Sequence, residues 1–138
     1  MRDIISLTKA KKALKQIADL TTLVGKGGVE SSGTDYIRFN DGTQICFKVV
    51  TCFYYNKTML RGTYTFPKAF KTTPVVNFSP DIVSETIAVP NTTVVSRIAN
   101  ASTTAVDVVV SRIAGLTYGD FVDGNQTPGH VYAIGRWK

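Results

Sequence analysis

Two stretches of the sequence combine aromatic rings with planar polar side chains, a mixture suited to recognising sugars. An aromatic face packs against the C–H groups of a sugar ring, while amide and carboxylate groups bind its hydroxyls. The stretches are 53–58 and 118–130, and the second carries three glycines, two carboxylates and the only histidine. A solvated turn without a ligand is the alternative for each. The candidate sugar-contacting residues are Tyr54, Tyr55, Asn56, Tyr118, Asp120, Asp123, Asn125 and His130.

Metal and redox chemistry have little support in the sequence. Cys46 and Cys52 are six residues apart, about 20 Å along one extended strand, which is too far for a disulfide. Two thiols and one histidine cannot complete a four-ligand zinc site. The segment 120–125 also lacks the terminal glutamate of an EF-hand. We therefore predict buried free thiols, no metal and no cofactor. The alternatives are a metal on a three-fold axis, held by one His130 from each of three copies, and an irregular calcium site in 120–125.

Enzymatic activity is not expected either. The sequence contains no GxSxG, P-loop or HExxH motif. A cysteine paired with His130 would need a reactive thiol, whereas both cysteines lie in strand-like sequence where thiols are usually inert. Asp120 and Asp123 are the one carboxylate pair that suggests glycoside hydrolysis. Binding, without catalysis, is the prediction.

The net charge of +6 does not indicate a nucleic-acid-binding protein. Six of the sixteen basic residues fall in the first 26, where they fit a solvated helix face, and no nucleic-acid-binding motif is present. No apolar run approaches the roughly 18 residues that span a bilayer, and the first residues lack the features of a signal peptide. We expect a soluble chain outside the secretory route, with a basic surface that attracts anionic partners.

Residues 3–24 are predicted to form a helix whose apolar residues follow a heptad spacing. Such a narrow stripe must be covered, either by the region that follows or by copies of the same helix. Self-association is the prediction, and it makes the helix a stalk. The a and d positions of that stalk are Leu7, Ala10, Leu14, Ile17, Thr21 and Val24.

After a glycine-rich joint at 25–28, short strand-like runs alternate with turn residues, which predicts an antiparallel β-sandwich or barrel. The chain thus divides into a stalk with its joint, 1–28, and a β-sandwich head, 29–138. In 44–49 the apolar Ile45, Phe47 and Val49 alternate with Gln44, Cys46 and Lys48, as expected for a half-buried strand. The predicted strands are 36–39, 44–53, 60–66, 75–79, 94–99, 105–113 and 131–137.

Two hairpins are predicted in the head. The turn 40–43 has the sequence NDGT, in which aspartate and glycine favour a tight reversal. The second hairpin joins 94–99 to 105–113. If its turn is centred on Ser102, Arg97 faces Asp107 and the two side chains pair across the strands. A ligand-binding role for Arg97 is the alternative.

Three motifs, in order along the chain, resemble the C-terminal domain of phage tail-fibre proteins. They are GTDYIRFNDGTQICF at 33–47, YTFPKAFKTTPVVNFSP at 64–80 and VYAIGRWK at 131–138, and the resemblance covers residues 33–138. The same layout is similar to H-type lectins, six-stranded antiparallel sandwiches that form trimers and bind sugars near subunit contacts. The matching residues are Ile37, Phe39, Asp41, Gly42, Thr43, Ile45, Cys46, Phe66, Pro67, Phe70, Pro74, Val76 and Ala133–Trp137.

The resemblance implies a mainly β fold: a six- to eight-stranded antiparallel sandwich of H-type-lectin kind, carried on a trimeric coiled-coil stalk. It implies a homotrimer at the tip of a tail fibre, assembled in the host cytoplasm and attached to upstream fibre or baseplate proteins. The expected function is attachment of the virion to a host-surface glycan or cell-wall polymer. The alternative is a structural trimerisation or capping module that has no ligand of its own.

Overall fold

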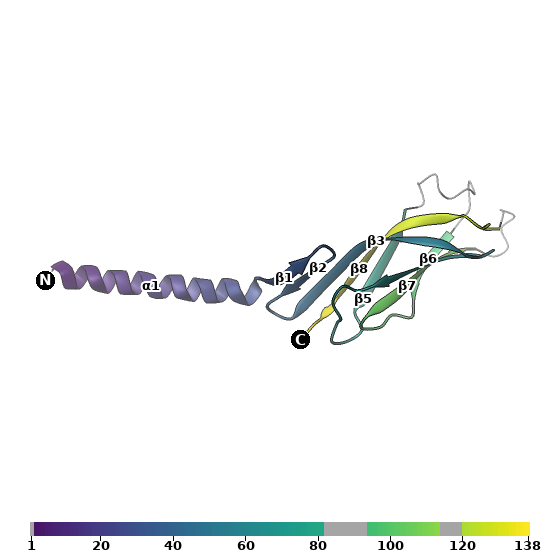
Figure 1. The fold of residues 1–138 in the computed structure, drawn as a ribbon. Coiled ribbons are helices and arrows are strands. Elements are labelled where there is room, and N and C mark those ends of the chain that lie inside the picture. The colour runs from purple at the N-terminus through teal and green to yellow at the C-terminus, as the bar shows by residue number, and fades with distance from the viewer. Residues whose placement is uncertain (1, 82–93, 114–119) are drawn as a thin grey trace.

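The computed structural model describes residues 2–81, 94–113 and 120–138, and within the helix it describes the side chains of residues 6–20. This part of the chain forms one long helix followed by eight strands (Figure 1). The elements are α1 (Arg2–Gly27), β1 (Val29–Gly33), β2 (Tyr36–Phe39), β3 (Thr43–Asn56), β4 (Met59–Thr65), β5 (Val75–Pro80), β6 (Val94–Ala99), β7 (Ala105–Arg112) and β8 (Gln126–Arg136).

The predicted helix is confirmed, and it continues through most of the predicted glycine joint to Gly27. It projects away from the strands as a straight rod (Figure 1). Every described side chain from 6 to 20 is exposed, including Leu7 at 57% and Leu14 at 66%. The strands therefore do not cover this part of the apolar stripe, which includes Ala10 and Ile17; the side chains of Thr21 and Val24 lie outside the described residues. No helix among the described residues is long and apolar enough to cross a membrane.

β3 organises the sheet because it uses both edges along its length. One edge pairs with β8 over eleven residue pairs, from Thr43 opposite Arg136 to Phe53 opposite Gln126. The other edge pairs first with β2 and then with β4. The strand order is β1-β2-β3-β4-β7-β6, with β8 on the remaining edge of β3 and β5 beyond it. All pairings are antiparallel, so the mainly β, antiparallel prediction is confirmed, at eight strands.

The sheet folds over so that one of its surfaces encloses a sandwich-like core. Alternate residues of each strand point to that inner surface, as the two-residue period of a strand requires. The buried apolar residues form a single cluster drawn from both halves of the sheet and from two connecting segments. Its members are Cys46, Val50, Cys52, Leu60, Tyr64, Phe66, Phe70, Phe78, Val106, Val108, Val110, Phe121, Val131 and Ala133.

On β3 the predicted alternation has the right period, but its apolar residues point outward. Gln44 and Cys46 are fully buried, whereas Val49 is 53% exposed. Gln44 tolerates burial because its side-chain amide donates to the Lys68 carbonyl oxygen at 2.8 Å and accepts from Arg38 Nε at 2.6 Å.

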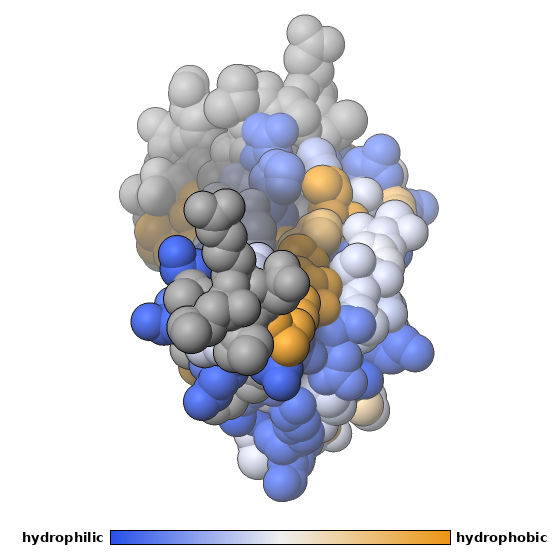
Figure 2. All heavy atoms as spheres, turned by 90° about the vertical axis from the view of Figure 1, so that its left-hand side faces the viewer, coloured by the Kyte–Doolittle hydropathy of each residue, from blue (hydrophilic) through white to orange (hydrophobic). Residues whose placement is uncertain are grey.

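The outer residues of β2, β3, β8 and β5 form an apolar surface, in which Ile37, Ile45 and Phe47 are half-buried and the other members are exposed. Cross-strand pairing aligns Ile37, Ile45, Ile134 and Val75 in one row over four strands. In the next row Phe47 lies opposite Tyr132. Figure 2, which views the molecule from the helix end, shows hydrophobic side chains gathered beside hydrophilic ones. We call the following set the apolar surface: Ile37, Ile45, Phe47, Val49, Val75, Tyr132 and Ile134.

The β6–β7 hairpin has a different register from the predicted one. Asp107 lies opposite Ala99, and Arg97 lies opposite Val109, so the predicted Arg97–Asp107 pair is wrong. The cause is the turn, in which Ser102 Oγ accepts from the backbone N–H groups of Thr104 and Ala105. These bonds place the centre of the hairpin one residue later, which moves each cross-strand partner by two.

The two cysteines are buried and free, as predicted. Burial raises the pKa of the Cys52 thiol to about 11 and also raises the pKa of the Cys46 thiol. Both thiols therefore stay protonated at neutral pH, the state in which cysteine is a poor nucleophile.

Candidate functional site

The structure brings the two predicted sugar-contacting stretches together at the end of the sandwich farthest from the helix (Figure 1). The backbone N–H of Tyr54 donates to the Asn125 carbonyl oxygen at 3.0 Å. The N–H of Phe121 donates to the Lys57 carbonyl oxygen at 2.9 Å. These two bonds join segments that are more than 60 residues apart in sequence.

Several of the candidate residues serve the fold. Tyr54 packs against the core, and Asn125 is 5% exposed, with Oδ1 accepting from the backbone N–H of Val122 at 2.9 Å. Asn56 Oδ1 accepts from the backbone N–H of Thr58 at 2.9 Å and so closes the β3–β4 turn. Asp120 forms an ion pair with Arg112. These side chains already have protein partners.

The remaining candidates are dispersed. Tyr55 and Asp123 are exposed near the far end, whereas His130 lies along β8, opposite Val49 and Ser79, on the outer surface. Tyr118 lies outside the described residues. The predicted loop 118–130 also needs correction, because its last five residues, 126–130, begin β8 and pair with β3.

Tyr55 forms part of a groove on the outer surface of β4, β7 and β6, about 290 Å³ in volume. Its floor is Val109, which is only 3% exposed although it points outward. Arg61 lies opposite Val109 on one side and Arg97 on the other, so one cross-strand row carries two guanidinium groups. We call this groove, lined by Tyr55, Met59, Arg61, Arg97, Ala99, Asn100 and Val109, the arginine groove.

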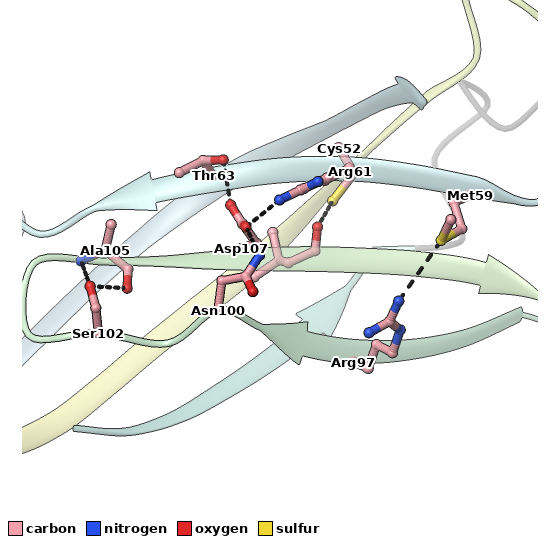
Figure 3. Close-up of polar contacts among 10 residues, drawn as sticks. Cys52, Met59, Arg61, Thr63, Arg97, Asn100, Ser102, Ala105 and Asp107 are labelled. Carbon is pink, nitrogen blue, oxygen red and sulfur yellow. Dashed lines mark hydrogen bonds and ion pairs between the residues drawn. The ribbon is translucent and has the colours of Figure 1, made fainter. Parts of the chain in front are cut away.

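A polar cluster centred on Asp107 holds one side of the arginine groove (Figure 3). The Asp107 carboxylate accepts from Arg61 Nη2, from Thr63 Oγ1 at 2.7 Å and from Asn100 Nδ2 at 2.7 Å. The bonds from Asn100 and Thr63, together with the ion pair to Arg61, lower the pKa of Asp107 to about 2. The carboxylate is therefore ionised at neutral pH and fixes Arg61 in place.

The other polar side chains of the groove are less constrained. The Arg61 guanidinium lies over the Tyr55 ring, 5.5 Å from its centroid, and Tyr55 is 57% exposed. Arg97 reaches Met59 Sδ at 3.9 Å, a weak contact (Figure 3). Among the described residues no carboxylate forms an ion pair with Arg97. Asn100 has a φ of 49°, a left-handed conformation that asparagine adopts more readily than most residues.

Sequence reasoning singled out Tyr55 but missed Arg61. A signal was present, since Leu60 and Tyr64 mark one face of the predicted strand 60–66 and leave Arg61 and Thr63 on the other. The part of the chain that the structure describes contains no cluster of three or more histidine, cysteine or acidic side chains that could hold a metal ion.

No protein-family model matches the chain, and no curated protein is similar to it at a significant level. Several solved structures, however, are similar to this chain. An N-truncated R1-type pyocin tail fibre is 24% identical, with a TM-score of 0.54 over 86% of this chain and 94% of that one. C-terminal parts of the R1 and R2 pyocin fibres of P. aeruginosa are 24% and 23% identical, with TM-scores of 0.51 and 0.52 over 76% and 79% of this chain.

These likenesses establish the fold. The chain spans about a quarter of the two longer P. aeruginosa fibre structures, 27% and 25%, and nearly all of the truncated one. The fold of this chain is thus similar to that of C-terminal parts of pyocin tail fibres. The more specific resemblance to H-type lectins stays a prediction.

Proposed function

We propose that this chain is the receptor-binding tip of a phage-type tail fibre, which attaches the particle to a host-surface glycan through a trimer of lectin-like heads. Residues 1–28 form the stalk and residues 29–138 form the head. Upstream fibre or baseplate proteins hold the stalk, and no catalytic step, metal or cofactor takes part. The protein acts at the end of the tail fibre, after assembly in the host cytoplasm.

One observation carries the proposal: the fold of this chain overlaps almost the whole of a truncated pyocin tail fibre, 94% of that chain. That fibre is truncated at its N-terminus, so the likeness is to a later part of a fibre and supports a terminal location. The free, buried thiols fit folding in a reducing compartment.

The trimer is supported by two separate apolar surfaces on the same chain. The first is the heptad stripe of α1, with Leu7 and Leu14 exposed. The second is the apolar surface, whose Ile37–Ile45–Ile134–Val75 row spans about 14 Å over four strands. Monomeric proteins rarely leave such contiguous apolar area in water. Copies of this chain are the occupant we propose, because a helix that associates through its stripe brings the attached heads together.

The polar residues within the apolar surface do not oppose this packing. The rows that continue from Phe47 and Val49 contain Asn77, Ser79 and His130. None of these three is a carboxylate, lysine or arginine, so the inner rows bring no fixed charge into the contact; Arg136, opposite Thr43 on the same face, lies at its edge.

Binding to cells tests the proposal. We would label the purified chain with a fluorophore, incubate it with a panel of bacterial strains that includes P. aeruginosa, and measure bound fluorescence by flow cytometry. We expect saturable binding to some strains, lost in mutants of those strains that lack surface polysaccharide. Failure of a folded, assembled chain to bind any strain contradicts receptor binding and favours the second candidate.

The second candidate is a structural module that trimerises or caps a fibre and has no ligand of its own. The same apolar surfaces favour it, because they explain the trimer without any binding function. If the chain is only a structural module, excess free chain should block neither adsorption nor killing by particles that carry it. The receptor-binding tip predicts that excess free chain competes for the host surface and reduces adsorption.

A further inference from the structure

The arginine groove has the shape of a site for a small part of a polymer. Its volume of about 290 Å³ is near the lower end of the roughly 300–1,000 Å³ typical of small-molecule sites, enough for one or two sugar rings. The two arginines flank Val109 in one row, so their backbones are about 10 Å apart, twice the strand spacing. A ligand over Val109 is within reach of both.

The charges in the groove are not balanced. Asp107 offsets the charge of Arg61, to which it is bonded, but Arg97 has only Met59 Sδ as a polar partner among the described residues. Counting the described residues, the groove therefore carries one positive charge in excess. A guanidinium group presents planar N–H donors that match two oxygens of a carboxylate or phosphate. An anionic group is the ligand feature that this side chain is suited to bind.

The opposite wall provides an aromatic surface. The Tyr55 ring is exposed, and the Asp107–Arg61 pair holds the Arg61 guanidinium over it. A sugar ring packs its C–H groups against such a surface, and the apolar Val109 and Met59 extend the same contact. The groove thus combines an apolar floor, an aromatic wall and one uncompensated cation.

We propose that the arginine groove binds an acidic saccharide, with Arg97 pairing to the carboxylate or phosphate of the sugar and Tyr55 packing against its ring. This inference rests on the proposed receptor-binding function and names the ligand class for it. The groove lies on the half of the outer surface that the subunit contacts leave free, so each copy in the trimer offers one site.

NMR titration of the full chain with three matched sugars tests the inference. Galacturonic acid carries a carboxylate, galactose 6-phosphate carries a phosphate, and galactose is neutral. We expect amide shifts around Tyr55, Arg97 and Asn100 with one or both acidic sugars, weakening as salt screens the charges, and no comparable shifts with galactose. The two acidic arms distinguish a carboxylate receptor from a phosphorylated one. Equal shifts with galactose would overturn the acidic assignment.

Two variants separate a site from general attraction to a basic surface. Arg97→Gln removes the uncompensated charge, and we expect it to lower the affinity for the acidic sugar by about tenfold or more. Lys71→Gln removes one exposed charge outside the groove and should change affinity by less than about twofold. If both variants weaken binding equally, or neither does, the groove is not the site. Unchanged thermal melting curves verify that both variants fold.

Cell binding by the same variants keeps this inference distinct from the proposed function. Cell binding by the wild type that survives Arg97→Gln leaves the receptor function standing and overturns the groove as its site. Acidic-sugar binding that depends on Arg97, without binding to any cell, supports the groove and contradicts the receptor function. If Arg97→Gln loses both cell binding and acidic-sugar binding while Lys71→Gln retains both, the receptor function and the groove as its site are both supported.

Discussion

The two halves of the outer surface belong to one continuous sheet, yet they differ in almost every chemical respect. On β2, β3, β8 and β5 the outward side chains form rows of isoleucine, valine and aromatic residues. On β4, β7 and β6 the outward side chains include Arg61, Asp107 and Arg97. β3 joins the two halves, because one of its edges pairs with β2 in the first part of the strand and with β4 in the last part.

The difference indicates two kinds of contact. The apolar half, whose one β8 cation Arg136 lies at its edge, gains most from contact with another apolar surface, because water is released from both. A half with a held ion pair and an exposed arginine gains more from a polar, anionic ligand in water. The first half suits the subunits of an assembly, and the second suits a partner outside it.

The largest effect is expected from a charge placed in the apolar half. Ile134→Asp should abolish or strongly weaken self-association, because each interface would bury an unpaired carboxylate. Sedimentation velocity at micromolar concentration should show the change from trimer to monomer. Val95→Asp is the matched control, because Val95 on β6 is 50% exposed and Ile134 is 49% exposed. If both variants lost self-association to the same extent, the apolar half would not be the surface through which the copies meet.

The second effect is on the stability of the polar half. Asp107→Asn removes the charge that binds three donors, and we expect the free energy of unfolding to fall by about 1–3 kcal/mol. Chemical denaturation at one fixed protein concentration measures the loss. Asp123→Asn, at an exposed position, should change stability by no more than about 0.5 kcal/mol. If Asp107→Asn left the free energy of unfolding unchanged, the Asp107 cluster would not be what holds the groove.

The same cluster predicts a pH dependence. The pKa of Asp107 is about 2 in the folded chain, below its ordinary value of 3.8. The unfolded chain therefore takes up the proton first as the pH falls. The stabilisation by Asp107 is complete above about pH 4 and is lost between about pH 4 and pH 2. Thermal melting against pH should show this loss in the wild type, and Asp107→Asn should flatten that part of the curve.

The smallest effect is expected at Asn100. Asn100→Gly removes one donor to Asp107 but relieves the left-handed backbone at φ 49°. These contributions oppose each other, so we expect a net change below about 1 kcal/mol, measured by denaturation. Asn100→Ala keeps the backbone cost and loses the donor, and it should be the more destabilising of the two. The reverse order would contradict the role assigned to this side chain.

Local patterns predicted most of the strands. β2 has the predicted bounds, 36–39, because turn residues mark both of its ends, and β6 ends at Ala99 as predicted, before the turn that begins at Asn100. β8 begins five residues before the predicted strand, since its glycine and proline suggested a loop. Pairing along β3 holds that segment extended despite its composition. The short β1 was not predicted; it pairs with β2 after the glycine joint.

What local patterns did not predict is which surface of a strand faces the core. In β3 an alternation of apolar residues usually indicates their burial, but here Ile45 and Phe47 point outward and Gln44 lies inside. Burial of Gln44 depends on partners from distant segments, Arg38 and the Lys68 backbone. The same limit applies to the arginine groove, because the pairing of Arg61, Val109 and Arg97 depends on the registers of three strands.

The long pairing of β3 with β8 has a mechanical consequence. The helix leaves one end of the sandwich, and β3 and β8 lie side by side, in opposite chain directions, over the length between that end and the other (Figure 1). A pull between the helix and a ligand at the far end loads this ladder in shear, so the force is shared among eleven residue pairs at once. A peeling load would break the pairs one after another at much lower force. The strand that organises the fold is therefore also its tensile element.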